Sequence, residues 1–204
     1  MQNTHKKHSK ITSISIATIT LAIAAGPAAA EEKSNSINAS PLGVLAGSYS
    51  LTYERMLSGG HGAIVEGNLS HANKDGSSQT SGGLTVGYRW HWRGQQNSGF
   101  LGVNAGYSRG TGSGSITTTT NNMQSTKSFD VDTGVFSLTA NIGKRWMLTD
   151  NLNITFRIGA GYGNYSVTTD STDPDAQKVT KAVDDLLHFL PVAFDGELSV
   201  GYNF

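Results

Sequence analysis

The sequence contains no cysteine, and charged residues make up only 15% of its 204 positions. Without cysteine, the chain has no disulfide scaffold, no thiolate metal site and no acylated lipoprotein cysteine. After residue 30 it also lacks any run of the roughly 18 apolar residues that indicates a membrane-spanning helix. The disulfides and thiolate metal sites that often stabilise small secreted domains are therefore missing. Glycine, with 25 residues, is abundant.

The first 30 residues have the pattern of a secretory signal peptide. Three lysines lie within the first ten residues, residues 11–25 are mainly apolar, and residues 28–30 are alanines suited to cleavage. A membrane anchor is the alternative, but the apolar stretch is shorter than the about 20 residues that a helical span requires, and no basic stop follows it. We expect export, with cleavage leaving residues 31–204 as the mature chain.

The mature chain of 174 residues has the length of one domain. Removal of the three leader lysines leaves 12 basic and 15 acidic residues, a net charge of −3. This balance argues against nucleic acid as a partner.

Apolar residues alternate with small or polar ones over long stretches. In residues 82–93 one face would carry Leu84, Val86, Tyr88, Trp90 and Trp92. The same period of two runs through residues 99–108, 136–145 and 152–163, and it predicts a strand in each. The opposite face of these strands consists mainly of glycine, serine, threonine and asparagine.

This second face does not fit a water-soluble β-sandwich. It is too small for an ordinary solvated face and too polar for an ordinary core. The contradiction disappears if the apolar face contacts lipid and the glycine-rich face fills a narrow, closed lumen. Strands of 10 to 14 residues also match the about 9 to 11 residues with which a tilted strand crosses a bilayer.

The chain ends on an aromatic residue in full strand pattern, with Leu198, Val200, Tyr202 and Phe204 on one face. This ending resembles that of the bacterial outer-membrane β-barrels, and PLGVLAGSYSLTYERML and GYRWHW resemble segments of the small members of that class. The resemblance implies that the last strand closes the barrel against the first and is the signal read by the barrel assembly machinery. It also implies a bacterial outer-membrane location, with lipid and lipopolysaccharide as partners. It names no activity.

Connection lengths support this topology, because short and longer connections alternate along the chain as periplasmic turns and external loops do. The short ones are residues 57–61, 94–98 and 147–151, and the longer ones are residues 72–79 and 109–127. We predict an all-β, eight-stranded antiparallel transmembrane up-and-down β-barrel, with two short strands in residues 36–57 joined by a tight turn near Ala46-Gly47-Ser48.

Two external loops are the candidates for specific binding, because loops on a rigid scaffold often carry function. Residues 109–127 predict an extended hairpin that turns at Asn121-Asn122. In the last loop, Asp173 and Pro174 predict the start of a short helix over the barrel mouth. Its apolar stripe would pack on the rim, with a partner or the outer leaflet as alternatives; it consists of Val179, Ala182, Val183, Leu186, Leu187 and Leu190.

The strand directions sort the aromatic residues toward two ends, as in the two interfacial girdles of a membrane barrel. The lower set, at the end with the short connections, is Trp90, Trp92, Trp146, Tyr53, Phe100, Tyr202 and Phe204. The upper set is Tyr107, Phe136, Tyr162 and Phe194.

Eight ionisable residues fall on the inward face: Glu54, Glu66, Arg89, His91, Arg145, Arg157, Asp195 and Glu197. Because an isolated buried charge is costly, these four acids should pair with the three arginines and the histidine. We interpret them as a polar network that plugs the barrel; an ion or proton path is the alternative.

No catalytic, cofactor or metal site is predicted. Ser70 and His71 lie where outer-membrane enzymes that trim lipid A place such residues, but neighbours on a strand point to opposite faces and cannot form a dyad. His61, His71, His91 and His188 lack a metal-ligand spacing. GTGSG at residues 110–114 lacks the end of a phosphate loop and predicts a flexible loop. The expected function is a non-enzymatic envelope-structural or adhesive role, with a lipid A modifying enzyme or a narrow channel as alternatives.

Overall fold

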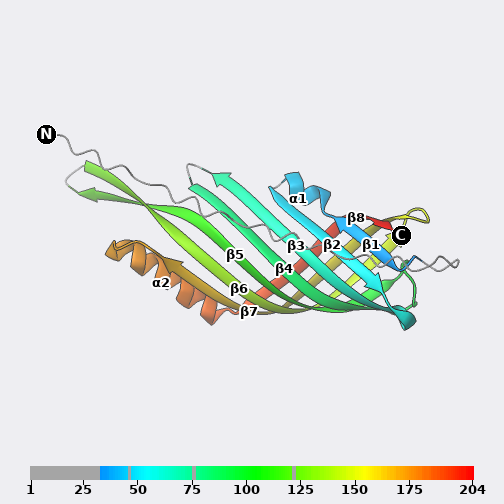
Figure 1. The fold of residues 1–204 in the computed structure, drawn as a ribbon. Helices are drawn as coiled ribbons and strands as arrows, with labels where there is room; N and C mark the ends of the chain where they lie inside the picture. The colour runs from blue at the N-terminus through cyan, green and yellow to red at the C-terminus, as the bar shows by residue number, and fades with distance from the viewer. Residues whose placement is uncertain (1–32, 46, 75–76, 121–122) are drawn as a thin grey trace. The chain divides into compact units, whose positions relative to one another are not determined.

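The computed structural model describes residues 33–45, 47–74, 77–120 and 123–204 (Figure 1). The predicted signal peptide, Ala46 and the predicted Asn121-Asn122 turn lie outside these residues. None of the helices in the described part of the chain has the length and apolar character needed to cross a membrane.

Within the described residues, eight antiparallel strands form a closed up-and-down barrel in which each strand pairs with the next and the last pairs with the first. The predicted architecture is thus confirmed. The strands are β1 Asn35–Ala39, β2 Ser48–Met56, β3 His61–Lys74, β4 Ser77–His91, β5 Gly99–Thr120, β6 Met123–Met147, β7 Leu152–Thr169 and β8 Val192–Asn203. The helices are α1 Pro41–Leu45, a 3-10 turn η1 at Ser58–Gly60, and α2 Pro174–Phe189.

The first hairpin differs from the prediction in its connection. Two short strands are present, but the helix α1 separates them, so a tight turn alone does not join them. Pro41 opens this helix, where its fixed φ and missing N–H are tolerated. Gly47 follows with a φ of 71°, and a side chain there would run into the His71 carbonyl oxygen. Glycine is therefore required at this corner.

The extended hairpin predicted in residues 109–127 is confirmed for the described residues 109–120 and 123–127. β5 and β6 remain paired from Gly99↔Lys144 up to Thr120↔Met123, so the hairpin continues far beyond β4 and β7 (Figure 1). The GTGSG segment lies inside β5, and the flexible loop expected there is wrong. Runs of threonine favour extended backbone, and pairing satisfies the backbone groups that a loop would leave to solvent.

The faces of the strands are sorted as the alternation predicts. Outward apolar side chains such as Val86 and Ile158 remain 58% and 59% exposed. The fully buried side chains are mostly polar or charged, and Arg89, Arg145 and Glu54 are among the largest of them. The interior of this barrel is therefore polar and its outer wall apolar.

One aromatic prediction is wrong. Phe100 was expected in the lower outer set, but it lies inside the barrel with no exposed surface, its ring 4.5 Å from the Arg89 guanidinium carbon. Side chains alternate along a strand and Leu101 faces outward, so Phe100 must face inward. Trp90, Trp146 and Tyr202 remain on the outer surface, about half exposed.

The seam between β8 and β1 is short. β8 pairs with β7 from Val192 to Tyr202, but it pairs with β1 only from Val200 to Asn203. Above this ladder, the Ser40 hydroxyl donates a hydrogen bond of 2.9 Å to the Leu198 carbonyl oxygen, and α1 contacts β8. The residues of β8 that precede Val200 thus pair with β7 on one side, and α1 contacts part of the other side.

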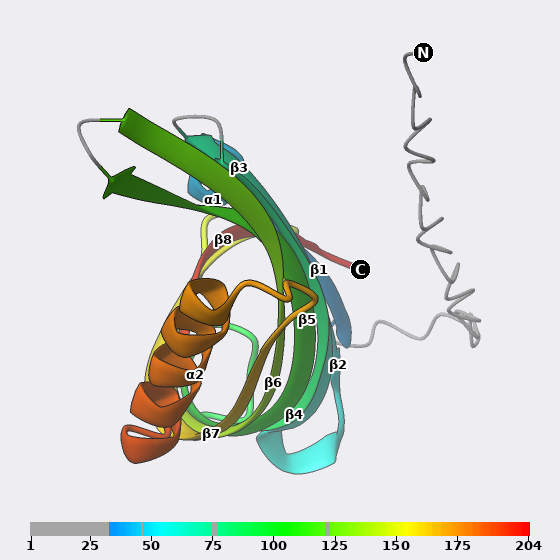
Figure 2. The same ribbon diagram turned by 90° about the vertical axis from the view of Figure 1, so that its left-hand side faces the viewer.

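The predicted helix in the last loop is confirmed as α2, which lies beside β7 (Figure 2). The Asp173 carboxylate caps it by accepting a hydrogen bond of 3.0 Å from the Asp175 N–H, and Pro174 occupies the first turn. The Asp184 carboxylate accepts a bond of 2.9 Å from the Val167 N–H and ties the helix to β7.

The buried face of α2 is not the predicted apolar stripe. Ala176 and Thr180 are buried, whereas Val179 and Leu186 are 50% and 57% exposed. Small side chains at positions 176 and 180 allow the helix to approach the strands closely. The apolar stripe thus lies beside the contact and stays half exposed.

The cap of α2 should depend on pH. The Lys127 ammonium, which donates a hydrogen bond of 2.8 Å to the Asp173 carboxylate, and the Asp175 N–H hold the pKa of Asp173 below its usual range. A lowered folded-state pKa means that the cap contributes fully above the unfolded-state pKa and is lost as the pH falls through the folded value. Amide protection factors in the first turn of α2 should therefore decrease in acid. In the Asp173→Asn variant, which still caps but does not ionise, they should not change with pH over this range; the same decrease in both proteins would contradict the assignment.

Glycine permits a close approach between β6 and β7. A Cβ at Gly161 would lie 2.6 Å from Thr139 Cα and closer still to the Leu138 carbonyl oxygen, both backbone atoms that cannot turn aside. We expect Gly161→Ala to lower the free energy of unfolding by about 1–3 kcal/mol. Gly67→Ala is the matched control, because a Cβ there meets its nearest atom, Leu84 Cδ2, at 3.8 Å. Urea unfolding of both variants in lipid vesicles measures the difference, and equal stabilities would contradict the close approach.

Candidate functional site

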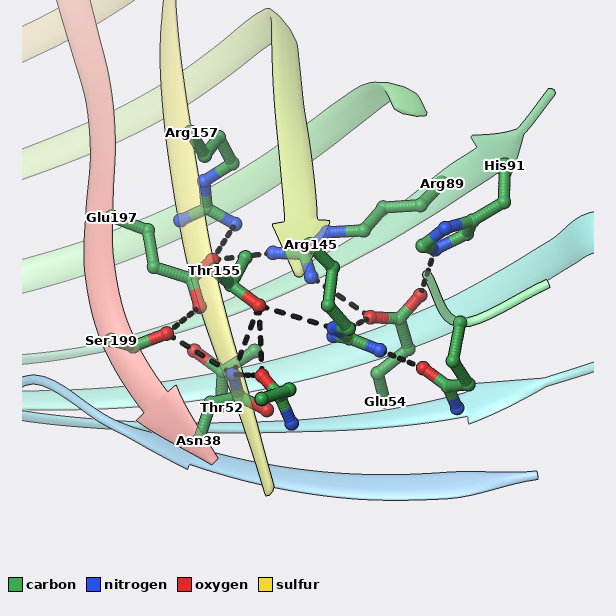
Figure 3. A network of polar contacts seen from close by, with 12 residues as sticks. Asn38, Thr52, Glu54, Arg89, His91, Arg145, Thr155, Arg157, Glu197 and Ser199 are labelled. Atoms are coloured by element: carbon green, nitrogen blue, oxygen red, sulfur yellow. Dashed lines mark hydrogen bonds and ion pairs between the residues drawn. The ribbon is translucent and has the colours of Figure 1, made fainter. Parts of the chain in front are cut away.

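The barrel interior contains a polar network centred on Glu54 (Figure 3). Its carboxylate accepts from Arg89 Nη1 at 2.8 Å and Arg145 Nη2 at 2.6 Å through Oε2, and it contacts His91 Nε2 at 2.8 Å through Oε1. The four side chains are fully buried. They project from β2, β4 and β6, so they meet across the interior and not between neighbouring strands.

A second centre is Arg157 on β7. Its guanidinium lies 2.8 Å from Glu66, 2.9 Å from Asp195 and 3.4 Å from Glu197. Glu197 also accepts from Arg89 Nη2 at 2.6 Å and thereby joins the two centres. The structure thus places all eight of the ionisable residues singled out in the sequence in one connected network.

Glycines on neighbouring strands provide the space for these long side chains. Arg89 lies between Gly62 and Gly102 in the strand register, and Arg157 lies opposite Gly143. A Cβ at Gly62 would collide with the Glu54 carboxylate. The glycine-rich inward face is therefore the steric counterpart of the charged side chains.

Neutral side chains that the sequence argument did not single out complete the network. Asp195 Oδ2 accepts from Asn104 at 2.7 Å, from Asn141 at 2.8 Å and from the Thr139 hydroxyl at 3.2 Å. The Ser199 hydroxyl donates to Glu197 at 2.6 Å. All four lie on the inward face of their strands, so the alternation itself was the signal that could have found them.

The end of the barrel that holds the C-terminus is closed by further polar contacts. Asn38 Nδ2 donates to Asn153 Oδ1 at 2.8 Å and to the Ser199 hydroxyl at 3.1 Å. Gln96, in the turn between β4 and β5, accepts from Arg145 Nη1. Gln96 lies in a turn, where side chains do not alternate between two faces, so the strand pattern did not indicate its role.

The network leaves little chemistry available. Each of the four carboxylates is paired with an arginine, and the two ring nitrogens of His91 contact Glu54 and, at 3.0 Å, the Ser98 hydroxyl. A water-filled passage would expose Arg89, Arg145 and Glu54, yet all three have no exposed surface. The arrangement can hold strands together and block the interior at this level.

The enzymatic alternative finds no assembled dyad around Ser70. Its hydroxyl lies 2.7 Å from that of Ser81 and is partly buried, whereas His71 is exposed and contacts the Thr80 hydroxyl at 2.9 Å and the Asn73 amide at 3.0 Å. The two residues point to opposite faces. Among the described residues, no group of three or more histidine or acidic side chains is arranged to hold a metal ion.

No protein-family model matches the sequence, and no curated protein matches it. Among solved structures, the chain is similar to CarO2 and CarO of Acinetobacter baumannii, each with a TM-score of 0.50 and 9% identity. Each alignment covers 84% of this chain, and 97% and 98% of the respective neighbour. The N-terminal β-barrel domain of Pseudomonas aeruginosa OprF gives a TM-score of 0.40 at 15% identity, covering 85% of this chain and 98% of that one.

The chain therefore shares the small eight-stranded β-barrel fold with CarO2 and CarO. At such low identity the likeness concerns the fold alone. Any function has to be argued from the residues of this chain.

Proposed function

We propose that the chain is a non-enzymatic bacterial outer-membrane β-barrel protein with an envelope-structural or binding role carried by its external end. The observation that supports this most is the inverted distribution of side chains, with leucine, valine, isoleucine and aromatic residues on the outer wall and paired charges inside. A soluble monomer rarely exposes so large an apolar surface. In a bilayer the same surface contacts acyl chains, and the closed ladders satisfy backbone groups inside the wall.

The ends of the barrel suggest its orientation. The described turns at the end that holds the C-terminus are short, whereas β5, β6 and α2 extend the other end. Short periplasmic turns and long external extensions are the rule in such barrels. β6 has 25 residues, far more than the about 9 to 11 needed for one crossing, so its first half would project outside.

This proposal includes the partners of such a protein. Lipid and lipopolysaccharide would contact the outer wall, and the barrel assembly machinery would read the terminal strand with Leu198, Val200, Tyr202 and Phe204. The leader in residues 1–30 would direct export. The external ligand, if the role is binding, would contact the extended end.

Membrane fractionation tests the location. The mature chain should pellet with outer membranes, resist extraction by salt and urea, and migrate differently on gels before and after boiling. Recovery of the folded mature chain as a monomer in detergent-free buffer would refute the membrane assignment.

The buried network also predicts that the barrel does not conduct ions. In planar bilayers the purified barrel should produce no stepwise conductance, because Arg89, Arg145 and Glu54 block the interior. An open porin measured in the same bilayers serves as the positive control. Reproducible conductance steps from the wild-type chain would favour the channel alternative.

A further inference from the structure

The wall of the barrel has an open backbone edge at the seam between β8 and β1. Asn35 and Phe204 exchange both of their backbone hydrogen bonds at 3.0 Å, so the even-numbered residues of β8 direct their N–H and C=O groups toward β1. The paired part of this edge ends at Val200. The even-numbered residues that lie beyond it are Leu198, Gly196, Phe194 and Val192.

Hydroxyl groups of the chain satisfy the carbonyl oxygens at the two ends of this open edge. The Ser40 hydroxyl donates to the Leu198 C=O at 2.9 Å, and the Tyr165 hydroxyl donates to the Val192 C=O at 2.6 Å. Between these two contacts, backbone groups directed to the same side have no hydrogen-bond partner in the described part of the chain. They are the N–H groups of Leu198, Gly196 and Phe194 and the C=O groups of Gly196 and Phe194.

The open edge lies at the depth of the bilayer. β8 pairs with β7 from Val192 to Tyr202, a ladder whose length matches the about 9 to 11 residues of one tilted crossing. The unpaired groups belong to this stretch, so they lie within the wall and not above it. Backbone groups without a partner are costly in hydrocarbon, and a ligand that pairs with them is favoured there.

The outer face of β8 leaves room for a ligand beside this edge. Gly196 is exposed, and a Cβ there would meet only the Arg157 carbonyl oxygen, at 3.9 Å. On either side of Gly196 along the strand, Phe194 is 87% exposed and Leu198 is 43% exposed. The helix α1, which contacts β8, adds Leu45 with an exposure of 86%. Apolar side chains thus surround backbone groups that can donate and accept; we call this place the seam site.

A second copy of the chain does not fit this edge in one membrane. Antiparallel pairing of two β8 edges relates the copies by a twofold axis perpendicular to the sheet. This axis lies in the membrane plane, because the wall of the barrel stands upright in the bilayer, and one copy would be inserted upside down. Lipid molecules contact the wall at this depth without any such constraint.

We infer that the seam site binds a membrane lipid whose acyl linkage carries an amide or a hydroxyl group. Such a group both donates and accepts hydrogen bonds, as the open edge requires, whereas an ester linkage only accepts them. The Ser40 and Tyr165 hydroxyls satisfy the ends of the same edge in this way. The acyl chain packs over Gly196 between Phe194 and Leu198. The inference rests on the proposed membrane location and adds to it the class of lipid that is bound.

Two lipids with the same headgroup test the site in the mature full-length chain inserted into phosphatidylcholine vesicles. Sphingomyelin has an amide linkage and a hydroxyl group, phosphatidylcholine has ester linkages, and a dibrominated acyl chain makes each a quencher of tryptophan. Trp90, Trp92 and Trp146 are first replaced by phenylalanine to remove background fluorescence. Phe194→Trp then reports on the seam site, and Phe136→Trp reports on lipid at the outer wall of β6.

The brominated sphingomyelin should quench the Phe194→Trp reporter with a relative affinity about five times that of the brominated phosphatidylcholine, the equivalent of one ordinary hydrogen bond. The Phe136→Trp reporter should respond equally to both lipids. Adding Gly196→Val should abolish the preference, because the side chain fills the site, and Gly196→Ala should weaken it. Gly67→Val is the matched control, since Gly67 also faces outward but has β2 and β4 paired on its two sides.

Equal quenching of the Phe194→Trp reporter by the two lipids would refute the lipid class and indicate that water satisfies the edge. A preference that persists in Gly196→Val would refute the seam site as the place of binding. Heat-modifiable gel mobility checks that each variant is folded. A folded chain that does not enter vesicles would overturn the membrane location and this inference together, so the two failures are distinguishable.

Discussion

Replacing Glu54 by glutamine is expected to lower the free energy of unfolding by about 3–5 kcal/mol, the usual loss when one partner of a buried ion pair is removed. Glu54 is the acid between Arg89 and Arg145, and both guanidiniums would remain buried after its charge is gone. The isosteric amide keeps the volume of the side chain, so the loss reports on charge and not on a cavity. Urea titration of the barrel in lipid vesicles, followed by gel mobility, measures the change.

Asp150→Asn is the matched control for this substitution. Asp150 is an exposed acid in the turn between β6 and β7, and its neutralisation should change stability by no more than about 0.5 kcal/mol. If Glu54→Gln unfolds at the same urea concentration as the wild type and the control, the network does not stabilise the barrel.

Replacing Arg157 by leucine is expected to destabilise the barrel by a similar amount, about 3–5 kcal/mol. This change leaves Glu66, Asp195 and Glu197 facing one another without their common cation. The melting temperature in detergent should fall by roughly 10 °C, given the size of the domain.

Two further variants separate charge from shape at this position. Arg157→Lys keeps the positive charge but loses the planar fork that reaches several carboxylates, so it should recover part of the lost stability. Arg109→Leu removes an exposed arginine of β5 and should have little effect. An unchanged melting temperature in Arg157→Leu would contradict the role assigned to the second centre.

The strand pattern was sufficient to derive the architecture. A period of two assigns every side chain of a strand to one of two faces, and here the two faces differ so strongly in polarity that only one assignment is consistent. The same rule, applied to Leu101, would have placed Phe100 inside from the start. Local signals were equally sufficient for α2, because Asp173 and Pro174 act on the backbone beside them.

Lengths of elements were harder to predict than their existence. The hairpin in residues 109–127 was predicted, but the glycine-containing composition of residues 110–114 indicated a flexible loop there; they belong to β5 because the partner strand offers hydrogen bonds along its length. The contact of α1 with β8, where β8 extends beyond its pairing with β1, joins opposite ends of the chain and has no signal in the local pattern.

The sequence by itself determined the number and kind of strands, the side of the wall on which each residue lies and the start of the last helix, because alternation and capping act over a few neighbouring residues. The tertiary structure decided which charges meet, since Glu54, Arg89 and Arg145 belong to strands that are not adjacent and touch only across the closed barrel. It also decided that Ala176 and Thr180 form the buried face of α2, because this depends on how the helix packs against β7.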